Sequence, residues 1–113
     1  MELQFYLQLS GKSPVIDAVR ALDAPSRAKV GAYLKTLEEQ GHKLREPHVK
    51  PMGSSLMELR IPIVNGKYRV FYFFANGTII VVLHAFQKKT QKTPDKEIEL
   101  ARKRMEDWKR RNL

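Results

Sequence analysis

The stretch that decides the fold is residues 57–88, MELRIPIVNGKYRVFYFFANGTIIVVLHAFQK, in which apolar runs surround two Asn-Gly pairs. Asn65-Gly66 and Asn76-Gly77 each predict a two-residue type I′ turn, and together they predict two consecutive β-hairpins. Counting outward from the turns fixes which residues face each other. The expected pairs are Phe73 with Ile80, Phe71 with Val82, Arg69 with His84, Val64 with Lys67, Pro62 with Arg69, and Arg60 with Phe71.

Side chains alternate across a strand, so the hairpins present two different faces. One face is expected to be the core and carries Met57, Leu59, Ile61, Tyr68, Val70, Tyr72, Phe74, Ile79, Val81 and Leu83. The other face has an apolar half, Phe71, Phe73, Ile80 and Val82, and a cationic half, Arg60, Lys67, Arg69, His84, Phe86 and Lys88. No carboxylate is expected between the arginines, because Glu58 lies nearer the apolar half.

The rest of the chain predicts helices around these hairpins. Residues 2–9 alternate loosely and indicate a first strand, and Ser13-Pro14 is a typical helix start. A second helix is expected from about Pro25 to Gly41, followed by a loop over 41–53. Strands are expected at about 55–62, 67–75 and 78–87. Thr93-Pro94 then opens a last helix that carries Ile98, Ala101, Met105 and Trp108 on one stripe.

These elements predict one α+β domain spanning residues 1–113. We expect a small, mainly antiparallel sheet of about four strands, with two N-terminal helices packed on one face and the C-terminal helix near the other. The chain has no cysteine, so disulfides, a thiolate nucleophile and a cysteine-based zinc site are excluded. It begins without a basic leader and has no apolar run of about 20 residues, so we expect a soluble cytoplasmic protein.

The net charge of +9 is concentrated in the middle of the chain. Residues 1–40 hold five basic and five acidic side chains, residues 41–94 hold nine and two, and residues 95–113 hold seven and five, giving net charges of 0, +7 and +2. The excess therefore coincides with the hairpins and their loops. Such a basic surface is typical of proteins that bind a polyanion.

The cationic half suits phosphodiester chemistry better than other reactions. The three histidines have no carboxylate at ligand spacing, and no phosphate-binding glycine loop, nucleophile elbow or carboxylate pair is present, so neither a metal nor another cofactor is expected. RNA cleavage by its own 2′-hydroxyl needs only proton transfer and cations on the phosphate. We expect His84 to transfer a proton and Arg60 and Arg69 to bind the phosphate. RNA-binding residues would be Lys67, Phe86, Lys88, Lys89 and Lys92.

Three segments resemble a known family: MELR at 57–60, YRVFY at 68–72, and LHAFQKKTQKTP at 83–94, followed by EIELA at 97–101. They are similar to the HigB-like (phage Gp49-like) branch of the RelE/ParE toxin superfamily. The resemblance implies a RelE-like fold and the toxin of a type II toxin–antitoxin pair. Its matching positions are Arg60, Arg69, His84, Phe86, Lys88 and Lys89.

The resemblance further implies a metal-independent endoribonuclease, an mRNA interferase that causes growth arrest. Such a toxin would cut mRNA in the ribosomal A site, leave a 2′,3′-cyclic phosphate, and be silenced by a cognate helix-turn-helix antitoxin. Two alternatives remain open from the sequence. One is a non-nuclease toxin of the same superfamily that inhibits DNA gyrase, and the other is an RNA- or ribosome-binding module without catalysis.

Overall fold

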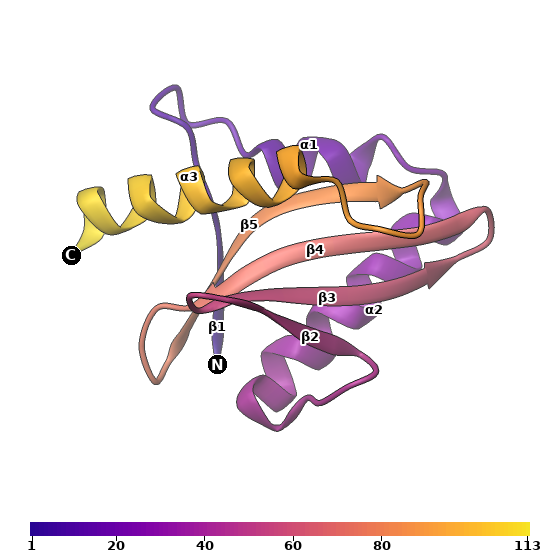
Figure 1. The fold of residues 1–113 in the computed structure, drawn as a ribbon, viewed down its shortest axis with the longest axis horizontal. Helices are drawn as coiled ribbons and strands as arrows, with labels where there is room; N and C mark the ends of the chain where they lie inside the picture. The colour runs from indigo at the N-terminus through magenta and orange to yellow at the C-terminus, as the bar shows by residue number, and fades with distance from the viewer.

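The computed structural model describes residues 1–113 and contains a five-stranded sheet in the order β1-β5-β4-β3-β2 (Figure 1). β1 runs parallel to β5, and the other neighbouring strands are antiparallel. The strands are β1 (Glu2–Phe5), β2 (Val49–Gly53), β3 (Leu56–Ile63), β4 (Gly66–Phe74) and β5 (Ile79–Lys88). The helices are α1 (Pro14–Arg20), α2 (Ala24–Gln40), the short 3-10 helix η1 (Gly41–Lys43) and α3 (Asp95–Asn112).

The α+β class is confirmed, with two differences in the sheet. It has five strands and is mixed, because β1 lies parallel beside β5. β2 occupies residues 49–53, within the segment that we expected to be a loop, and β1 ends at Phe5 although we expected a strand to residue 9. The β2–β3 turn is made by Ser54 and Ser55, both at positive φ, a combination that does not signal a hairpin in the sequence.

Helix α1 begins at the expected cap, Ser13, and α2 begins at Ala24, one residue before the expected start, with Asp23 as a cap that the sequence analysis did not name. The Ser13 hydroxyl accepts a hydrogen bond from the Ile16 amide, and the Asp23 carboxylate accepts one from the Ser26 amide. α2 ends at Gly41, where φ is +52°. No helix in this structure combines the length and the apolar character needed to cross a bilayer.

The sheet has a hydrophobic core on each face. On the α1/α2 face, Val15, Val30 and Leu37 pack against Leu59, Ile61, Tyr68, Val70, Tyr72, Ile80, Val82 and Ala85. On the α3 face, Ala101, Met105 and Trp108 pack against Phe71, Phe73, Val81 and Leu83. Figure 1 shows α3 and α2 on opposite sides of the strands. The N-terminal helices and the C-terminal helix thus pack on opposite faces of the sheet.

The β3–β4 pairing differs from the expected register by two residues. Val64 and Asn65 form the two-residue loop, so that Ile63 pairs with Gly66 and Arg60 lies directly opposite Arg69. We expected Arg60 opposite Phe71. A shift of two residues leaves every side chain on its expected face.

The β4–β5 pairing differs from the expected register at two places, and the second difference restores the expected alternation of side chains. The Asn76 carboxamide accepts from the Thr78 amide and hydroxyl and from the Ile79 amide, which forms a four-residue loop over 75–78 instead of a type I′ turn. The register is thereby displaced by one residue, and Phe73 pairs with Val81. Ile79, Val81 and Leu83 consequently lie on the α3 face, and Ile80 and Val82 lie on the α1/α2 face, opposite to the expectation.

Leu83 then has no partner on β4, because Tyr72 pairs with Val82 and Phe71 pairs with His84. This β-bulge adds one residue to β5 and reverses the alternation again. His84, Phe86 and Lys88 therefore share the α3 face with Phe71, Arg69 and Lys67, as expected. The direct neighbour of Arg69 is Phe86, however, and not His84.

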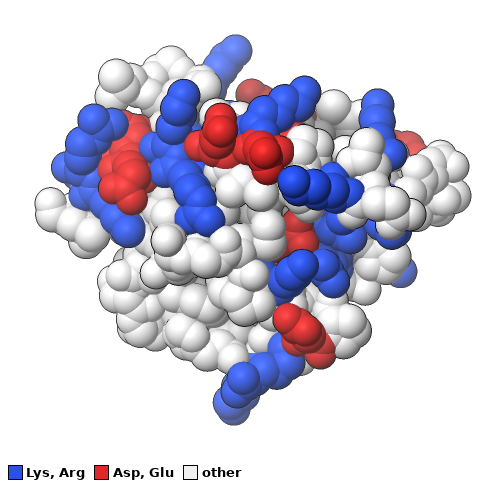
Figure 2. All heavy atoms as spheres, viewed as in Figure 1, with Lys and Arg blue, Asp and Glu red and all other residues white.

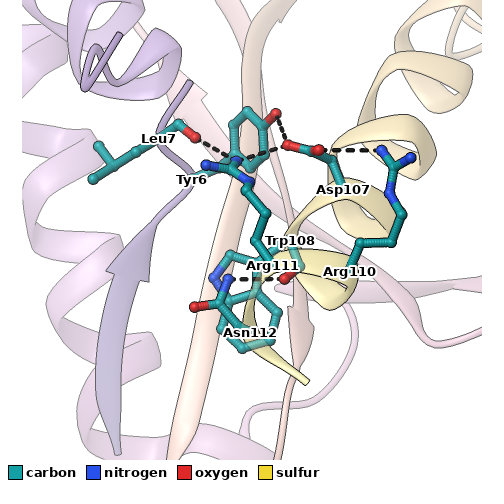
Figure 3. Close-up of polar contacts among 7 residues, drawn as sticks. All are labelled: Tyr6, Leu7, Asp107, Trp108, Arg110, Arg111 and Asn112. Atoms are coloured by element: carbon teal, nitrogen blue, oxygen red, sulfur yellow. Dashed lines mark hydrogen bonds and ion pairs between the residues drawn. The ribbon is translucent and has the colours of Figure 1, made fainter. Parts of the chain in front are cut away.

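The C-terminal half of α3 is fastened to the chain that follows β1 (Figure 3). The Tyr6 hydroxyl donates to Asp107 Oδ2 at 2.6 Å, and Arg111 donates to both Asp107 and the Leu7 carbonyl. The hydrogen bond from Tyr6 is the main cause that lowers the pKa of Asp107. Two segments about a hundred residues apart in sequence are thus joined by polar contacts.

Candidate nucleic-acid interface

A basic cavity of about 400 Å³ opens on the α3 face of the sheet. It lies between β2, β3, the end of β5, the segment that connects β5 to α3, and the first turn of α3. Its lining consists of Lys50, Met52, Glu58, Arg60, Lys88, Gln91, Lys92, Thr93 and Ile98. Figure 2 shows Lys and Arg atoms gathered over β3 and β4 below the connecting segment, whereas basic and acidic atoms alternate along α3.

Arg60 and Arg69 form a cross-strand pair at this cavity. The Arg60 side chain is 33% exposed and reaches the cavity lining, whereas that of Arg69 is 8% exposed and lies beneath it. Burial lowers the pKa of the Arg69 guanidinium, and the charge of Glu58 opposes that shift. Arg69 donates from Nη1 to the Tyr68 carbonyl, but its buried Nε has no hydrogen-bond partner.

Glu58 lies between the two arginines, contrary to the expectation from the sequence. Its Oε1 atom is 3.2 Å from Arg60 Nε and 3.7 Å from Arg69 Nε. The reason is the two-residue register shift, which moves Arg60 beside Arg69 and brings Glu58 into the adjacent position on the same face. Two guanidinium groups on one pleat repel each other, and the carboxylate between them offsets this repulsion.

Thr93 completes the support of this carboxylate. Its hydroxyl donates to Glu58 Oε2 at 3.1 Å, and both side chains are buried. We expected Thr93 to cap α3, but the cap position is occupied by Pro94, which provides no side-chain hydrogen bond. Sequence reasoning missed Glu58 and Thr93 as members of the site, although strand alternation already placed Glu58 on the correct face.

Both nitrogens of His84 are engaged by α3. Nε2 lies 3.2 Å from Glu97 Oε1, and Nδ1 lies 3.2 Å from Arg104 Nη1, which also donates to the Leu83 carbonyl. Because an arginine can only donate, Nδ1 acts as the acceptor and the ring proton is on Nε2. Burial is the main cause that lowers the His84 pKa; Glu97 opposes the shift and Arg104 adds to it. The side chain is 12% exposed and does not line the cavity.

Phe86 lies opposite Arg69 and beside two aromatic rings. Its ring centroid is 5.3 Å from His84 with an interplanar angle of 18°, and 5.4 Å from Phe71. It is half-buried and packs against the core of the α3 face. Part of its ring is therefore buried in the protein interior.

The lysines expected at the site differ in their positions. Lys88 and Lys92 line the cavity, and the exposed Lys67 is paired with Lys88 across the strands. Lys89 is exposed and lies outside the lining. Burial, followed by the nearby charge of Arg69, lowers the pKa of Lys88. The structure contains no cluster of three or more His, Asp or Glu side chains that could hold a metal ion.

Most of the chain matches a known protein family. Residues 17–106 match the family described as "Phage derived protein Gp49-like (DUF891)", and the chain belongs to this family. The match confirms the resemblance to the phage Gp49-like branch that the sequence motifs indicated.

Two relatives share part of the chain. It is 44% identical over 62 residues to "Probable endoribonuclease HigB1" of Mycobacterium tuberculosis strain CDC 1551 / Oshkosh, a match that covers 55% of this chain and 49% of the relative. The same values hold for "Probable endoribonuclease HigB1" of strain ATCC 25618 / H37Rv. The chain thus spans about half the length of the curated relatives it matches.

Proposed function

We propose that this protein is the toxin of a type II toxin–antitoxin pair and acts as a metal-independent endoribonuclease on mRNA. The observation that carries the proposal is the cavity on the α3 face, where Lys50, Arg60, Lys88 and Lys92 surround a single carboxylate. Cations in this arrangement bind a phosphodiester and stabilise the extra negative charge of its transition state. The similarity to two proteins named as probable endoribonucleases supports the same reaction.

The residues expected from the sequence take different parts in this reaction. Arg60 contacts the scissile phosphate, because its guanidinium reaches the cavity. Arg69 supports Arg60 from below through their shared carboxylate, Glu58. His84 acts by positioning, since it holds Glu97 and Arg104 of α3 against β5 and so keeps one wall of the cavity in place.

The remaining basic residues bind the RNA on either side of the cleaved bond. Lys67, Lys89 and Lys92 contact flanking phosphates, Lys88 contacts the RNA inside the cavity, and the exposed edge of Phe86 contacts a base. The substrate is mRNA in the ribosomal A site, and attack by the 2′-hydroxyl leaves a 2′,3′-cyclic phosphate. A cognate helix-turn-helix antitoxin silences the toxin in the cytoplasm.

Inducible expression in bacteria, with and without the adjacent antitoxin gene, tests this function. The wild-type protein should arrest growth, and the antitoxin should relieve the arrest. Arg60→Ala should abolish toxicity, because the cavity loses its most accessible guanidinium. Arg20→Ala, on the exposed side of α1, is the matched control and should remain toxic.

Mapping mRNA 5′ ends in the arrested cells identifies the mode of action. New 5′ ends at defined codon positions support the endoribonuclease. Intact transcripts together with an induced DNA-damage response would instead indicate gyrase inhibition, and intact transcripts without that response would leave only RNA or ribosome binding.

A further inference from the structure

Cleavage by the 2′-hydroxyl requires a group that accepts its proton, and the hydrogen bonds around the cavity limit which group can do so. His84 Nδ1 already accepts from Arg104, and Nε2 carries the ring proton and donates to Glu97. The guanidinium group of arginine and the ammonium group of lysine have no acceptor atom. The imidazole is therefore not available as the base, although its residue type suggested that role.

Two carboxylates lie close to the cationic residues, and only one of them faces the cavity. Glu97 is bound to His84 and does not line the cavity, whereas Glu58 is part of the lining. Glu58 is held on both oxygens, since Oε1 faces the two guanidinium groups and Oε2 accepts from Thr93. A carboxylate has about four acceptor positions, so these contacts leave capacity to accept a further proton.

The burial of Glu58 suits this role. At 1% exposure, the carboxylate is shielded from bulk water, and a 2′-hydroxyl reaches it only when the more exposed Arg60 guanidinium moves aside to bind the phosphate. The guanidinium of Arg60, 3.2 Å away, can hold a phosphate at the same entrance. A 2′-hydroxyl adjacent to that phosphate would then approach the carboxylate.

The leaving 5′-oxygen needs a proton, and Lys88 is placed to donate it. Lys88 lines the cavity from β5, whereas Glu58 lines it from β3, with β4 between the two strands. Burial and the neighbouring cations Arg69, Lys67 and Arg60 favour loss of a proton from its ammonium group, and the charge of Glu58 opposes this effect. Acid and base would thus approach the phosphate from two different strands.

We propose that Glu58 is the general base and Lys88 the general acid of RNA cleavage, an assignment that rests on the proposed function. The 2′-hydroxyl loses its proton to the Glu58 carboxylate while its oxygen forms a bond to phosphorus. The bond between phosphorus and the 5′-oxygen breaks, and this oxygen takes a proton from the Lys88 ammonium. The products are a 2′,3′-cyclic phosphate and a 5′-hydroxyl, and proton exchange with water restores both side chains.

Glu58→Gln tests the base, because the amide keeps the shape of the side chain and can still contact Thr93. Single-turnover cleavage of an mRNA with a mapped cleavage position should slow by about 10²- to 10⁴-fold. Affinity for a 2′-O-methyl RNA, which lacks the attacking hydroxyl, should stay within about threefold of wild type. Glu99→Gln, an exposed position on α3, is the matched control and should cleave at the wild-type rate.

The acid is tested with an RNA that has sulfur in place of the 5′-oxygen at the cleaved bond. A thiolate leaves without protonation, so Lys88→Ala should be slow on normal RNA and close to wild type on the sulfur-containing RNA. Glu58→Gln should remain slow on both substrates, because the attacking hydroxyl still needs a base. Lys35→Ala, exposed on α2, serves as the control for loss of a surface lysine.

The outcomes separate this assignment from the proposed function. A wild-type protein that cuts no mRNA overturns the function itself. If wild type cleaves and Glu58→Gln cleaves equally fast, the base is another group. If Glu58→Gln melts at the wild-type temperature but loses affinity for 2′-O-methyl RNA, Glu58 only positions the arginines, and the assignment is wrong. A Lys88→Ala variant that is equally slow on both RNAs excludes Lys88 as the acid.

Discussion

His84 is held between an anion and a cation from the same helix. Glu97 faces Nε2 and Arg104 faces Nδ1, while the aromatic rings of Phe71 and Phe86 lie beside the imidazole. Charging the ring would place a cation against Arg104 in a half-buried position. Burial and Arg104 together therefore outweigh the attraction of Glu97, and the neutral form is favoured.

This arrangement predicts a pH-dependent stability. The pKa of His84 in the folded protein lies below its ordinary value of 6.5, so the unfolded chain binds more protons between the two values. The contribution of the neutral His84 to the free energy of unfolding is fully present above about pH 6.5. It is lost as the pH falls through the pKa of the folded state. Urea unfolding measured over this range should show the loss, and His84→Gln should reduce the slope. An unchanged slope in that variant would assign the pH dependence to other groups.

Helix α3 makes two different sets of contacts along its length. Its N-terminal part, up to Arg104, contributes Glu97, Ile98 and Arg104 to the surroundings of the cavity and of His84. Its second half packs Trp108 edge-on against Phe73, with ring centroids 5.7 Å apart, and is tied to Tyr6 through Asp107. Stability at the C-terminal end thus helps to hold the wall of the cavity.

Tyr6→Phe should show how much the contact between Tyr6 and Asp107 contributes. It removes a 2.6 Å hydrogen bond to a carboxylate and leaves the aromatic packing intact. We expect the free energy of unfolding to fall by about 1 kcal/mol in urea denaturation, with faster amide hydrogen exchange over residues 105–112.

Arg110→Ala is the control for this prediction. Its ion pair with Asp107 involves a side chain that is 77% exposed, so its loss should cost under about 0.5 kcal/mol. Equal losses in the two variants would show that the hydroxyl of Tyr6 adds nothing beyond the surface ion pairs.

For the whole molecule, the distribution of charge matters more than its sum. Of the net charge of +9, +7 belongs to residues 41–94, which form β2 to β5 and the connecting segment. On α3, by contrast, Lys109, Arg110 and Arg111 are paired with Glu106 or Asp107. Part of the excess in residues 41–94, on Lys50, Lys88 and Lys92, lies at the cavity.

RNA binding should accordingly depend on salt through the residues of the cavity. Affinity for a single-stranded 2′-O-methyl RNA should fall linearly on a plot of log K against log salt concentration. Lys92→Ala removes one phosphate contact and should reduce the slope by about 0.7, whereas Lys35→Ala on α2 should leave it unchanged. Equal slopes for wild type and Lys92→Ala would place the RNA elsewhere on the molecule.

Local sequence patterns were enough to predict the three α-helices, the strands other than β2, and the face on which the cationic residues gather. The helix cap at Ser13 depends on a local hydrogen bond, and alternation along a strand depends only on backbone geometry, so both can be predicted without the fold. The bulge at Leu83 changes the pairing but preserves this face, because its one-residue shift cancels the parity change made by the loop over 75–78.

The tertiary structure alone decided which partners meet on that face. Several features join residues that are distant in sequence. These are the strand register, the parallel pairing of β1 with β5, the pairing of β2 with β3, and the contact of Thr93 with Glu58. The same is true of α3, which brings Glu97 and Arg104 to His84. Local sequence patterns carry no information about such contacts, because the contacts depend on how separate elements pack. It is this packing that placed the Glu58 carboxylate between the two arginines.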